Sequence, residues 1–186
     1  MPTSAPILSG YVFVTGRPEK AEEAARLGLS LERIELDLPE PQSLDPTVVA
    51  EAKARAAFER LGRPVVVEDS GLEIDAWGGF PGALVKWLEK SAGLEGITRM
   101  LDSFPDRSAR AVCAIACFDG RRLIAVRGVS EGAIAPARRG AGGFGWDAIF
   151  VPRGSSGTYA EITPEEKDRV SHRGNAWRDL AKKLGG

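Results

Sequence analysis

Cysteine and histidine are scarce in this sequence. Its 186 residues include two cysteines, Cys113 and Cys117, and a single histidine. Both cysteines fall in one predicted strand, where four residues span about 13 Å, whereas a disulfide needs Cα atoms within about 7 Å. We therefore expect two reduced, buried thiols and no disulfide framework.

Long hydrophobic runs are also missing. The longest, Ala111–Phe118, has eight residues, well below the roughly 20 residues of a membrane-spanning helix. Met1–Gly10 has no Lys or Arg before its apolar residues and does not match a signal peptide. These absences predict no membrane association and a cytoplasmic location.

The sequence has no excess of charge of either sign. Lys and Arg total 25 against 26 Asp and Glu, which gives a net charge of −1. Because nonspecific binding to a DNA or RNA backbone needs many uncompensated cations, no nucleic-acid partner is expected. A small anionic ligand bound by a few local cations remains compatible with this balance. The length and the 43% of hydrophobic residues suit one domain over residues 1–186.

Apolar runs that alternate with helical patterns predict an α/β fold. A long hairpin follows, because Asp119-Gly120 tolerates the positive φ angles of a tight turn between two strand patterns. This order implies a mixed central β-sheet with flanking helices. The predicted strands are 11–14, 31–38, 64–67, 109–118 and 121–129, with 146–151 extended. The predicted helices are 18–27, 46–61, 83–90 and 94–101, one that begins at 164, and one that begins near 171.

The first strand leads directly into the turn Thr15–Lys20. A glycine turn at a helix N-terminus offers free backbone N–H groups and the positive end of the helix dipole, which together favour anions. Lys20, one turn into the helix, would add a full charge. The chain has no G-x-x-x-x-G-K-[ST] motif, and a purely structural turn is the alternative interpretation.

The run Gly140–Gly145 matches G-x-G-x-x-G, but it does not follow a strand and open a helix, as the dinucleotide fingerprint requires. We interpret it as a glycine loop that presents Phe144 and Trp146, whose flat faces would stack on a nucleobase. The alternative is that both aromatic side chains pack in the core.

Three carboxylates follow two of the predicted strands. Glu40 comes after the second strand, and Glu68 and Asp69 come after the third. If these strands are neighbours, the carboxylates converge at one edge of the sheet, where open α/β folds bind ligands. Mg²⁺ prefers one or two such oxygens together with waters and substrate phosphates. Solvated acids at the start of loops are the alternative.

The single histidine stands in Ser171-His172-Arg173. Ser171 is a credible N-cap of the last helix and would explain the local sequence without a function. Arg173 supplies a fork of donors suited to carbonyl or phosphate oxygens. His172 could serve Ser70 as a base, but the spacing does not favour that pair over many others.

Taken in order, these segments resemble the inosine triphosphate pyrophosphatase family almost from end to end. The most specific matches are Glu68-Asp69-Ser70-Gly71-Leu72, Phe144-Gly145-Trp146-Asp147 and Ser171-His172-Arg173. The resemblance implies two lobes around a nucleotide cleft, and a homodimer. It also implies hydrolysis of ITP, dITP or XTP to a nucleoside monophosphate and pyrophosphate, which removes these nucleotides from the pool.

The resemblance assigns roles to residues of this sequence. Glu40 and Asp69 would hold Mg²⁺, and Asp69 would also act as the general base. Lys167, His172 and Arg173 would face the 6-oxo group of the purine; fixed donors there would reject adenine, whose amine is also a donor. The other substrate-binding residues that it implies are Thr15, Gly16, Lys20 and Lys53 at the triphosphate, Phe144, Gly145, Trp146 and Asp147 at the purine, and Ser70 and Arg17.

Two positions depart from the family pattern. Arg17 stands where the family has Asn in a Thr-Gly-Asn turn. Its guanidinium could take over a phosphate contact as a bidentate donor, or it could point outward and leave the turn short of one hydrogen bond. Ala148 replaces the Pro that usually follows Phe-Gly-Trp-Asp, which should affect loop rigidity more than chemistry.

Two other functions stay open on the sequence alone. One is a pyrophosphatase for other modified or standard nucleotides, and the other is a nucleotide-binding module without catalysis. Guanine also carries a 6-oxo group, so its rejection has to depend on the 2-position of the purine.

Overall fold

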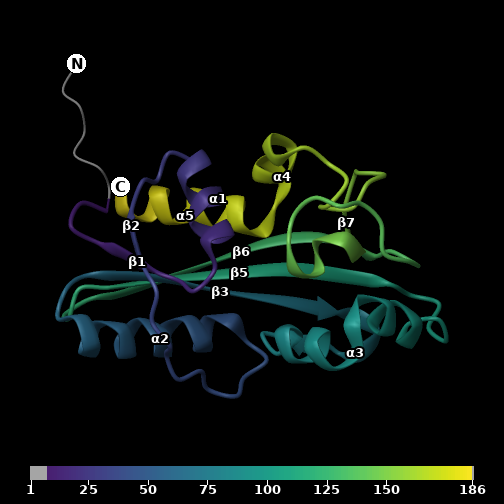
Figure 1. The fold of residues 1–186 in the computed structure, drawn as a ribbon, viewed down its shortest axis with the longest axis horizontal. Coiled ribbons are helices and arrows are strands. Elements are labelled where there is room, and N and C mark those ends of the chain that lie inside the picture. The colour runs from purple at the N-terminus through teal and green to yellow at the C-terminus, as the bar shows by residue number, and fades with distance from the viewer. Residues whose placement is uncertain (1–7, 186) are drawn as a thin grey trace.

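The computed structural model describes residues 8–185, which form a mixed β-sheet with helices on both faces (Figure 1). The order across the sheet is β2-β1-β3-β5-β6-β7, with β4 paired to β3. β1, β2 and β3 are parallel, and the other pairs are antiparallel, so the predicted mixed sheet is confirmed. The strands are β1 (Val12–Val14), β2 (Glu32–Ile34), β3 (Val65–Ile74), β4 (Pro81–Gly82), β5 (Ser108–Phe118), β6 (Leu123–Ile134) and β7 (Phe150–Pro152).

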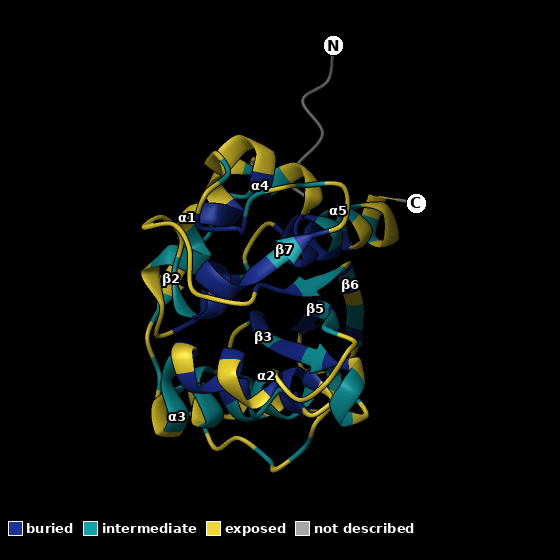
Figure 2. Cartoon of the chain, turned by 90° about the vertical axis from the view of Figure 1, so that its right-hand side faces the viewer, coloured by how far each residue is buried: buried dark blue, intermediate teal, exposed yellow. Residues whose placement is uncertain are grey.

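Helices cover both faces of the sheet (Figures 1 and 2). One face carries α2 (Pro46–Leu61) and α3 (Val85–Met100), and the other carries α1 (Pro18–Arg26), α4 (Pro164–Val170) and α5 (His172–Gly185). Two short 3₁₀ segments are η1 (Asp75–Trp77) and η2 (Gly145–Ile149). A strand that is covered on both faces is apolar on both faces, which accounts for the run Val65–Val67.

Side-chain caps set the first residues of three helices. At α2, the Asp45 carboxylate accepts a hydrogen bond of 2.8 Å from the Thr47 amide. At α4, Thr163 and Glu166 each accept a hydrogen bond from the backbone amide of the other. At α5, the Ser171 hydroxyl accepts a hydrogen bond of 3.0 Å from the Gly174 amide. The predicted capping box and the predicted cap of the last helix are therefore confirmed.

The third strand extends much further than the sequence predicts. β3 does not end at Val67 but continues to Ile74, so Glu68 and Asp69 lie inside a strand and not after one. Each residue from Val65 to Ile74 pairs with a residue of β5. This ladder outweighs the low strand preference of acidic residues, which depends on tertiary context.

Other predicted boundaries are also wrong. The second strand is limited to Glu32–Ile34, because β1, with which it pairs, has only three residues. Residues 146–149 belong to the 3₁₀ segment η2, and only β7 after them is extended. The hairpin loop spans residues 119–122, since Phe118 pairs with Leu123. By contrast, the two short helices predicted at 83–90 and 94–101 are confirmed, because α3 consists of two helical parts separated at Gly93 by a non-helical φ of 69°.

The unequal lengths of β1 and β3 leave one edge of β3 open. The two strands pair from Val12–Val65 to Val14–Val67, and β3 then continues while the chain after β1 turns into α1. Residues 68–70 therefore have no neighbouring strand on that side among the described residues. This is the edge at which the candidate site lies.

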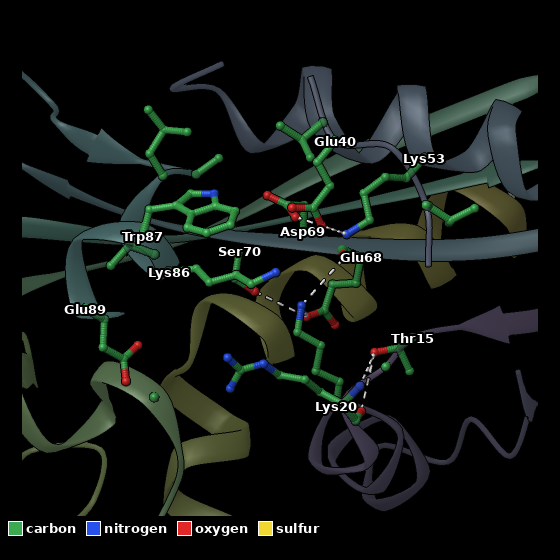
Figure 3. A pocket seen from close by; sticks show the side chains of 18 of the residues that line it. Thr15, Lys20, Glu40, Lys53, Glu68, Asp69, Ser70, Lys86, Trp87 and Glu89 are labelled. Carbon is green, nitrogen blue, oxygen red and sulfur yellow. Dashed lines mark hydrogen bonds and ion pairs between the residues drawn. The ribbon is translucent and has the colours of Figure 1, made fainter. Parts of the chain in front are cut away.

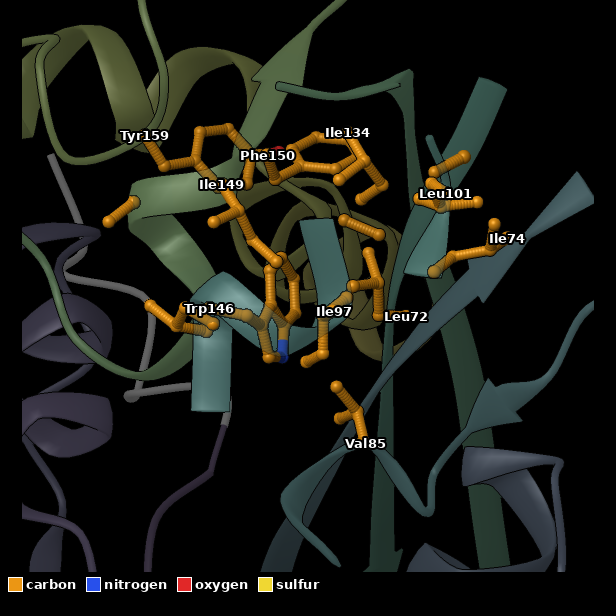
Figure 4. Packing of buried hydrophobic residues seen from close by; sticks show 14 of the residues in the cluster. Leu72, Ile74, Val85, Ile97, Leu101, Ile134, Trp146, Ile149, Phe150 and Tyr159 are labelled. Carbon is orange, nitrogen blue, oxygen red and sulfur yellow. The ribbon is translucent and has the colours of Figure 1, made fainter. Parts of the chain in front are cut away.

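Three clusters of buried side chains surround this edge. In the first, Ile97 of α3 and Phe150 of β7 pack around Trp146 (Figure 4). In the second, the ring of Phe13 in β1 meets that of Trp177 in α5 edge to face, with centroids 5.6 Å apart. The third joins α2 to the parallel strands. The elements that carry the site are thus held from three sides.

Both cysteines are buried free thiols, as predicted. Burial raises the pKa of Cys117 to about 12. Within residues 8–185, we find no helix with the length and hydropathy needed to cross a bilayer. Residues 1–7, which belong to the segment predicted to lack a signal peptide, lie outside the described residues.

We predict that Gly128→Ala destabilises the fold. A methyl group at Gly128 in β6 would lie 2.2 Å from the Ala176 amide nitrogen and 2.2 Å from the His172 carbonyl oxygen, both in α5. Because this overlap involves backbone, the free energy of unfolding should fall by about 3 kcal/mol, measured by urea denaturation. Gly185→Ala, with no heavy atom within 4 Å, is the control. Equal midpoints for the two variants would contradict this close packing.

Candidate active site

A cleft of about 840 Å³ opens at the free edge of β3 (Figure 3). Its walls come from the turn after β1, the segment 35–43, α2, β3, the start of α3, the segment 144–147 and the start of α5. It therefore separates the α1 and α5 side from the α3 side, as the two-lobed prediction requires. The predicted residues that line it are Thr15, Gly16, Arg17, Lys20, Glu40, Lys53, Asp69, Ser70, Phe144, Gly145, Trp146, Asp147, His172 and Arg173, and Glu68 lines it too.

The turn after β1 is held by its own hydrogen bonds. The Thr15 hydroxyl oxygen accepts a hydrogen bond of 3.1 Å from the Arg17 amide, and the Thr15 amide donates to the Ile34 carbonyl at 3.0 Å. The Lys20 ammonium lies 3.3 Å from the Glu68 carboxylate (Figure 3). This arrangement places a helix N-terminus and a lysine at the cleft, which favours an anion there.

Glu40 and Asp69 share one ammonium group. Lys53 of α2 lies 2.9 Å from Oε1 of Glu40 and 3.3 Å from Oδ1 of Asp69 (Figure 3). Burial raises the pKa of Asp69 to about 6, against the opposing effect of Lys53 and Lys20. Burial alone would also raise the pKa of Glu40, but its contact with Lys53 lowers it. Asp69 therefore titrates close to the pH range in which a general base works best.

This pair of carboxylates fits a hard divalent cation. Their oxygens already converge on a positive charge, the Lys53 ammonium. Among residues 8–185, no group of three His, Cys, Asp or Glu side chains could hold a metal ion. Waters and substrate phosphates would have to complete the coordination shell, which is the arrangement that Mg²⁺ prefers.

Glu68 is not a third member of this pair. Successive side chains of a strand point to opposite faces of the sheet, and Glu68 contacts Lys20 of α1 and Arg173 of α5, whereas Asp69 contacts Lys53 of α2. Burial would raise the pKa of Glu68, but Arg173 and Lys20 lower it to about 2. Glu68 is thus a partner of cations. The expected convergence of the three acids depended on the second and third strands being neighbours, and β1 lies between them in the sheet.

Two buried cations lie at the other end of the cleft. The Arg173 guanidinium is 2.9 Å from both carboxylate oxygens of Glu68 and also pairs with Glu23. The Lys167 ammonium lies 2.8 Å from Glu23 and 2.5 Å from Asp147. All five side chains are at most 6% exposed. Charges this deeply buried require partners, and here each cation has two acids.

His172 is neutral in these surroundings. Burial and the neighbouring Arg173 lower its pKa well below the usual value. Its ring packs against those of Trp146 and Tyr159, with centroids 5.2 and 5.8 Å away. Its Nδ1 is buried without a hydrogen-bond partner among the described residues. A buried polar atom without a partner calls for an explanation, and a ligand in the adjoining cleft would supply one.

The aromatic residues at this end have different surroundings. Trp146 is 8% exposed and belongs to a hydrophobic cluster. Most of its indole therefore packs in the core, which was the alternative to stacking on a base, although the residue also lines the cleft. Phe144 is half-buried, and its amide donates a hydrogen bond of 2.8 Å to Asp147. The Phe144 ring therefore remains available to a ligand.

In the described part of the chain, Lys167 lies outside the cleft lining, and the serine–histidine pair that the spacing did not favour is absent. Lys167 does not line the cleft, because Glu23 and Asp147 enclose its ammonium. The Ser70 hydroxyl donates to Glu68 at 3.3 Å and accepts from Arg173 at 3.2 Å. It makes no hydrogen bond with His172, so a serine–histidine pair has no support.

Several residues of the site escaped the sequence analysis. Glu23 is one turn after Lys20 in α1, and that helical spacing was the signal that would have placed it on the same face. Lys86, Trp87 and Glu89 line the cleft from α3 (Figure 3). Their positions on the helix resemble those of a solvent-exposed face, so nothing in the sequence indicated that they line a cleft.

Comparisons with known proteins agree with the fold. Residues 11–183 match the sequence model of the Ham1 family. A dITP/XTP pyrophosphatase of Methanopyrus kandleri is 41% identical over 91% of this chain and 93% of that protein. An inosine triphosphate pyrophosphatase of Saccharomyces cerevisiae is 40% identical over 93% and 94%. The solved structure of a Ham1 protein from Coxiella burnetii superimposes with a TM-score of 0.81 at 30% identity, over 94% of this chain and 98% of that one.

We predict that Glu23→Gln lowers stability, because it removes the carboxylate that both Arg173 and Lys167 contact. Leaving buried cations without one partner should cost about 3 kcal/mol of unfolding free energy. Urea denaturation measures this change. The matched control is Glu22→Gln, since Glu22 is exposed on the same helix and its loss should cost little. Equal stability of the two variants would show that Glu23 is not needed to neutralise the buried cations.

Proposed function

The chain belongs to the Ham1 family, and we propose that it hydrolyses the deaminated purine nucleoside triphosphates ITP, dITP and XTP to the monophosphate and pyrophosphate. One observation carries this proposal. A single cleft contains a cationic turn, a pair of carboxylates and a set of buried donors beside a half-buried aromatic ring. These are the parts needed for a triphosphate, a metal-assisted hydrolysis and a purine, and the relatives described above support the same activity.

The phosphates would bind at the turn after β1. Thr15, Gly16 and Lys20 line the cleft from one side, and Lys20 contributes an ammonium group there. Lys53 and Lys86 face it from the other, and the positive charge of Lys86 contributes to the lowered pKa of Glu40. Cations on both sides of a pyrophosphate leaving group would stabilise the charge that develops as the bond breaks.

The chemistry would take place at Asp69. A divalent cation, Mg²⁺ in our proposal, would be held by Glu40 and Asp69 and would supply phosphate neutralisation and a more acidic water. Asp69 would accept a proton as water forms a bond to the α-phosphorus. The bond from that phosphorus to the bridging oxygen breaks, and pyrophosphate leaves with the electron pair. A carboxylate with a pKa of about 6 suits this proton transfer.

The purine would bind at the opposite end. Its face would stack on Phe144, and its 6-oxo group would accept hydrogen bonds from His172 and Arg173, which line the cleft, whereas Lys167 would act only through its buried ion pairs with Glu23 and Asp147. His172 has the unpartnered Nδ1 described above, and Arg173 is fixed by its acids. Adenine would present an amine to these donors and leave buried groups unpaired, a mismatch that discriminates strongly.

Three expectations from the sequence analysis remain proposals here. They are a homodimer, a single catalytic domain over residues 1–186, and a cytoplasmic location. The first is tested by light scattering on the purified protein, and the others by limited proteolysis and cell fractionation.

We predict that Asp69→Asn abolishes turnover and leaves nucleotide binding nearly intact. Loss of a general base should lower kcat for ITP about 10²-fold to 10⁴-fold, measured as pyrophosphate released. The affinity for ITP, measured by calorimetry without Mg²⁺, should change little. Asp179→Asn is the control, because Asp179 is an exposed acid paired with Lys182. An Asp69→Asn protein with the wild-type rate would rule out the assigned base.

A substrate panel separates the three candidate functions. With Mg²⁺, we expect pyrophosphate release from ITP, dITP and XTP to exceed release from ATP, GTP, UTP and TTP by at least 10²-fold, and a chelator should abolish it. Faster release from UTP or TTP would favour a pyrophosphatase for other nucleotides. Tight ITP binding without any Mg²⁺-dependent release would favour a binding module.

A further inference from the structure

Arg17, the residue that departs from the family pattern, points into the base end of the cleft. Its guanidinium carbon lies 5.9 Å from the centroid of the Phe144 ring. A methyl group at Gly145 would lie 4.0 Å from Nη1 of Arg17 and 3.7 Å from Oε2 of Glu89. The side chain therefore lies beside the Phe144 ring and Gly145, a position that the sequence did not suggest.

The N–H donors of the Arg17 guanidinium are available to a ligand. Within residues 8–185 the guanidinium makes no hydrogen bond or ion pair, and the bonded groups of Arg17 are its backbone amide, which donates to the Thr15 hydroxyl, and its carbonyl, which accepts from the Lys20 amide. Lys167 and Arg173 also lie near the Phe144 ring, at 4.9 and 5.4 Å, but both are enclosed by acids. Arg17 is exposed at the mouth of the cleft, so it can meet a ligand without losing a protein partner.

Glu89 reaches the same place from the opposite lobe. It lies on α3 and lines the cleft (Figure 3). Burial raises the pKa of Glu89, and the charge of Arg17 opposes that rise. Gly145, with a φ of +58°, leaves room between the two side chains. Although the two side chains form no ion pair, the negative charge of Glu89 attracts the guanidinium toward the base end of the cleft.

The two edges of a purine would face different residues in this cleft. The 6-oxo group and N7 lie on one edge of the base, and N3 and the 2-substituent lie on the other, next to the sugar. If the 6-oxo group points to His172 and Arg173, the sugar lies toward the turn after β1, where the phosphates would bind. The edge with the 2-substituent then faces Arg17, which belongs to this turn.

We infer that Arg17 is a specificity-determining residue that reads the 2-position of the purine and selects xanthine over hypoxanthine and guanine. Xanthine has an oxygen acceptor at this position, hypoxanthine has a hydrogen, and guanine has an amine. A guanidinium is a pure donor, so it would bond to xanthine, gain nothing from hypoxanthine and oppose guanine. The inference rests on the proposed function and adds XTP as the preferred substrate.

The test compares kcat/KM between substrates as ratios, because a general loss of folded protein lowers every rate equally and leaves the ratios unchanged. We would determine kcat/KM for XTP, ITP and GTP with the wild type, Arg17→Asn and Arg17→Lys. Asparagine is a favoured residue at the position before the first turn of a helix, so this substitution should not disturb α1. A hydrogen bond to a charged group supports about a 10-fold to 100-fold preference. Arg17→Asn should lower the XTP to ITP ratio by that factor and raise the GTP to ITP ratio, and Arg17→Lys should fall between.

Arg63→Asn provides the matched control. Arg63 pairs with Glu32 on the surface and does not line the cleft, so its loss should leave all three rates unchanged. Glu89→Gln should lower the XTP to ITP ratio partially, because the guanidinium would be less well held. The inference would be overturned if Arg17→Asn reduced kcat/KM for XTP and for ITP equally and left their ratio within 2-fold of the wild type. That result would indicate a phosphate contact.

Binding of the monophosphates XMP and IMP separates this inference from the proposed function. The wild type should bind XMP more tightly than IMP, and Arg17→Asn should remove the difference, as measured by calorimetry without turnover. Absence of ITP and XTP hydrolysis by the wild type would count against the proposed function alone. Equal affinities for XMP and IMP in the wild type would count against Arg17 as the reader of the 2-position.

Discussion

The buried charges beneath the cleft constrain the rest of this structure. Arg173 and Lys167 are almost fully removed from water, and such cations are tolerated only when acids surround them. Glu23, Glu68 and Asp147 meet this requirement from three separate elements, α1, β3 and η2. The same network fixes where these elements lie relative to one another. It also keeps His172 neutral, because a further positive charge beside Arg173 would be unfavourable.

A second constraint comes from the strands. β1 has three residues and β3 has ten, so β3 presents a free edge beyond Val67. Because side chains alternate along a strand, Glu68 and Asp69 face opposite sides although they are adjacent in sequence. One of them joins the buried network, and the other joins Lys53 and Glu40. Two neighbouring acids of the same strand therefore have different pKa values, about 2 and about 6.

The part of the fold that depends on short-range signals could be predicted from the sequence. The caps at Asp45, Thr163 and Ser171 act through hydrogen bonds to residues two or three positions away. The site motifs that matched a known family also placed most of the cleft lining correctly. The extent of β3 could not be predicted, because its last seven residues are held by pairing with β5, more than thirty residues later in the chain.

The sequence by itself determined the alternation of strands and helices and the absence of a disulfide, since these follow from residue type and local spacing, and its resemblance to a known family indicated most of the residues that line the cleft. Only the tertiary structure decided which acid binds which cation. Glu23, Lys167 and Arg173 are separated by up to 150 positions, and nothing local relates them. The same holds for Arg17, whose side chain lies beside Phe144 and Glu89 only because the turn after β1 and the start of α3 face each other across the cleft. Burial and contact between distant segments set these pairings, and both exist only in the folded chain.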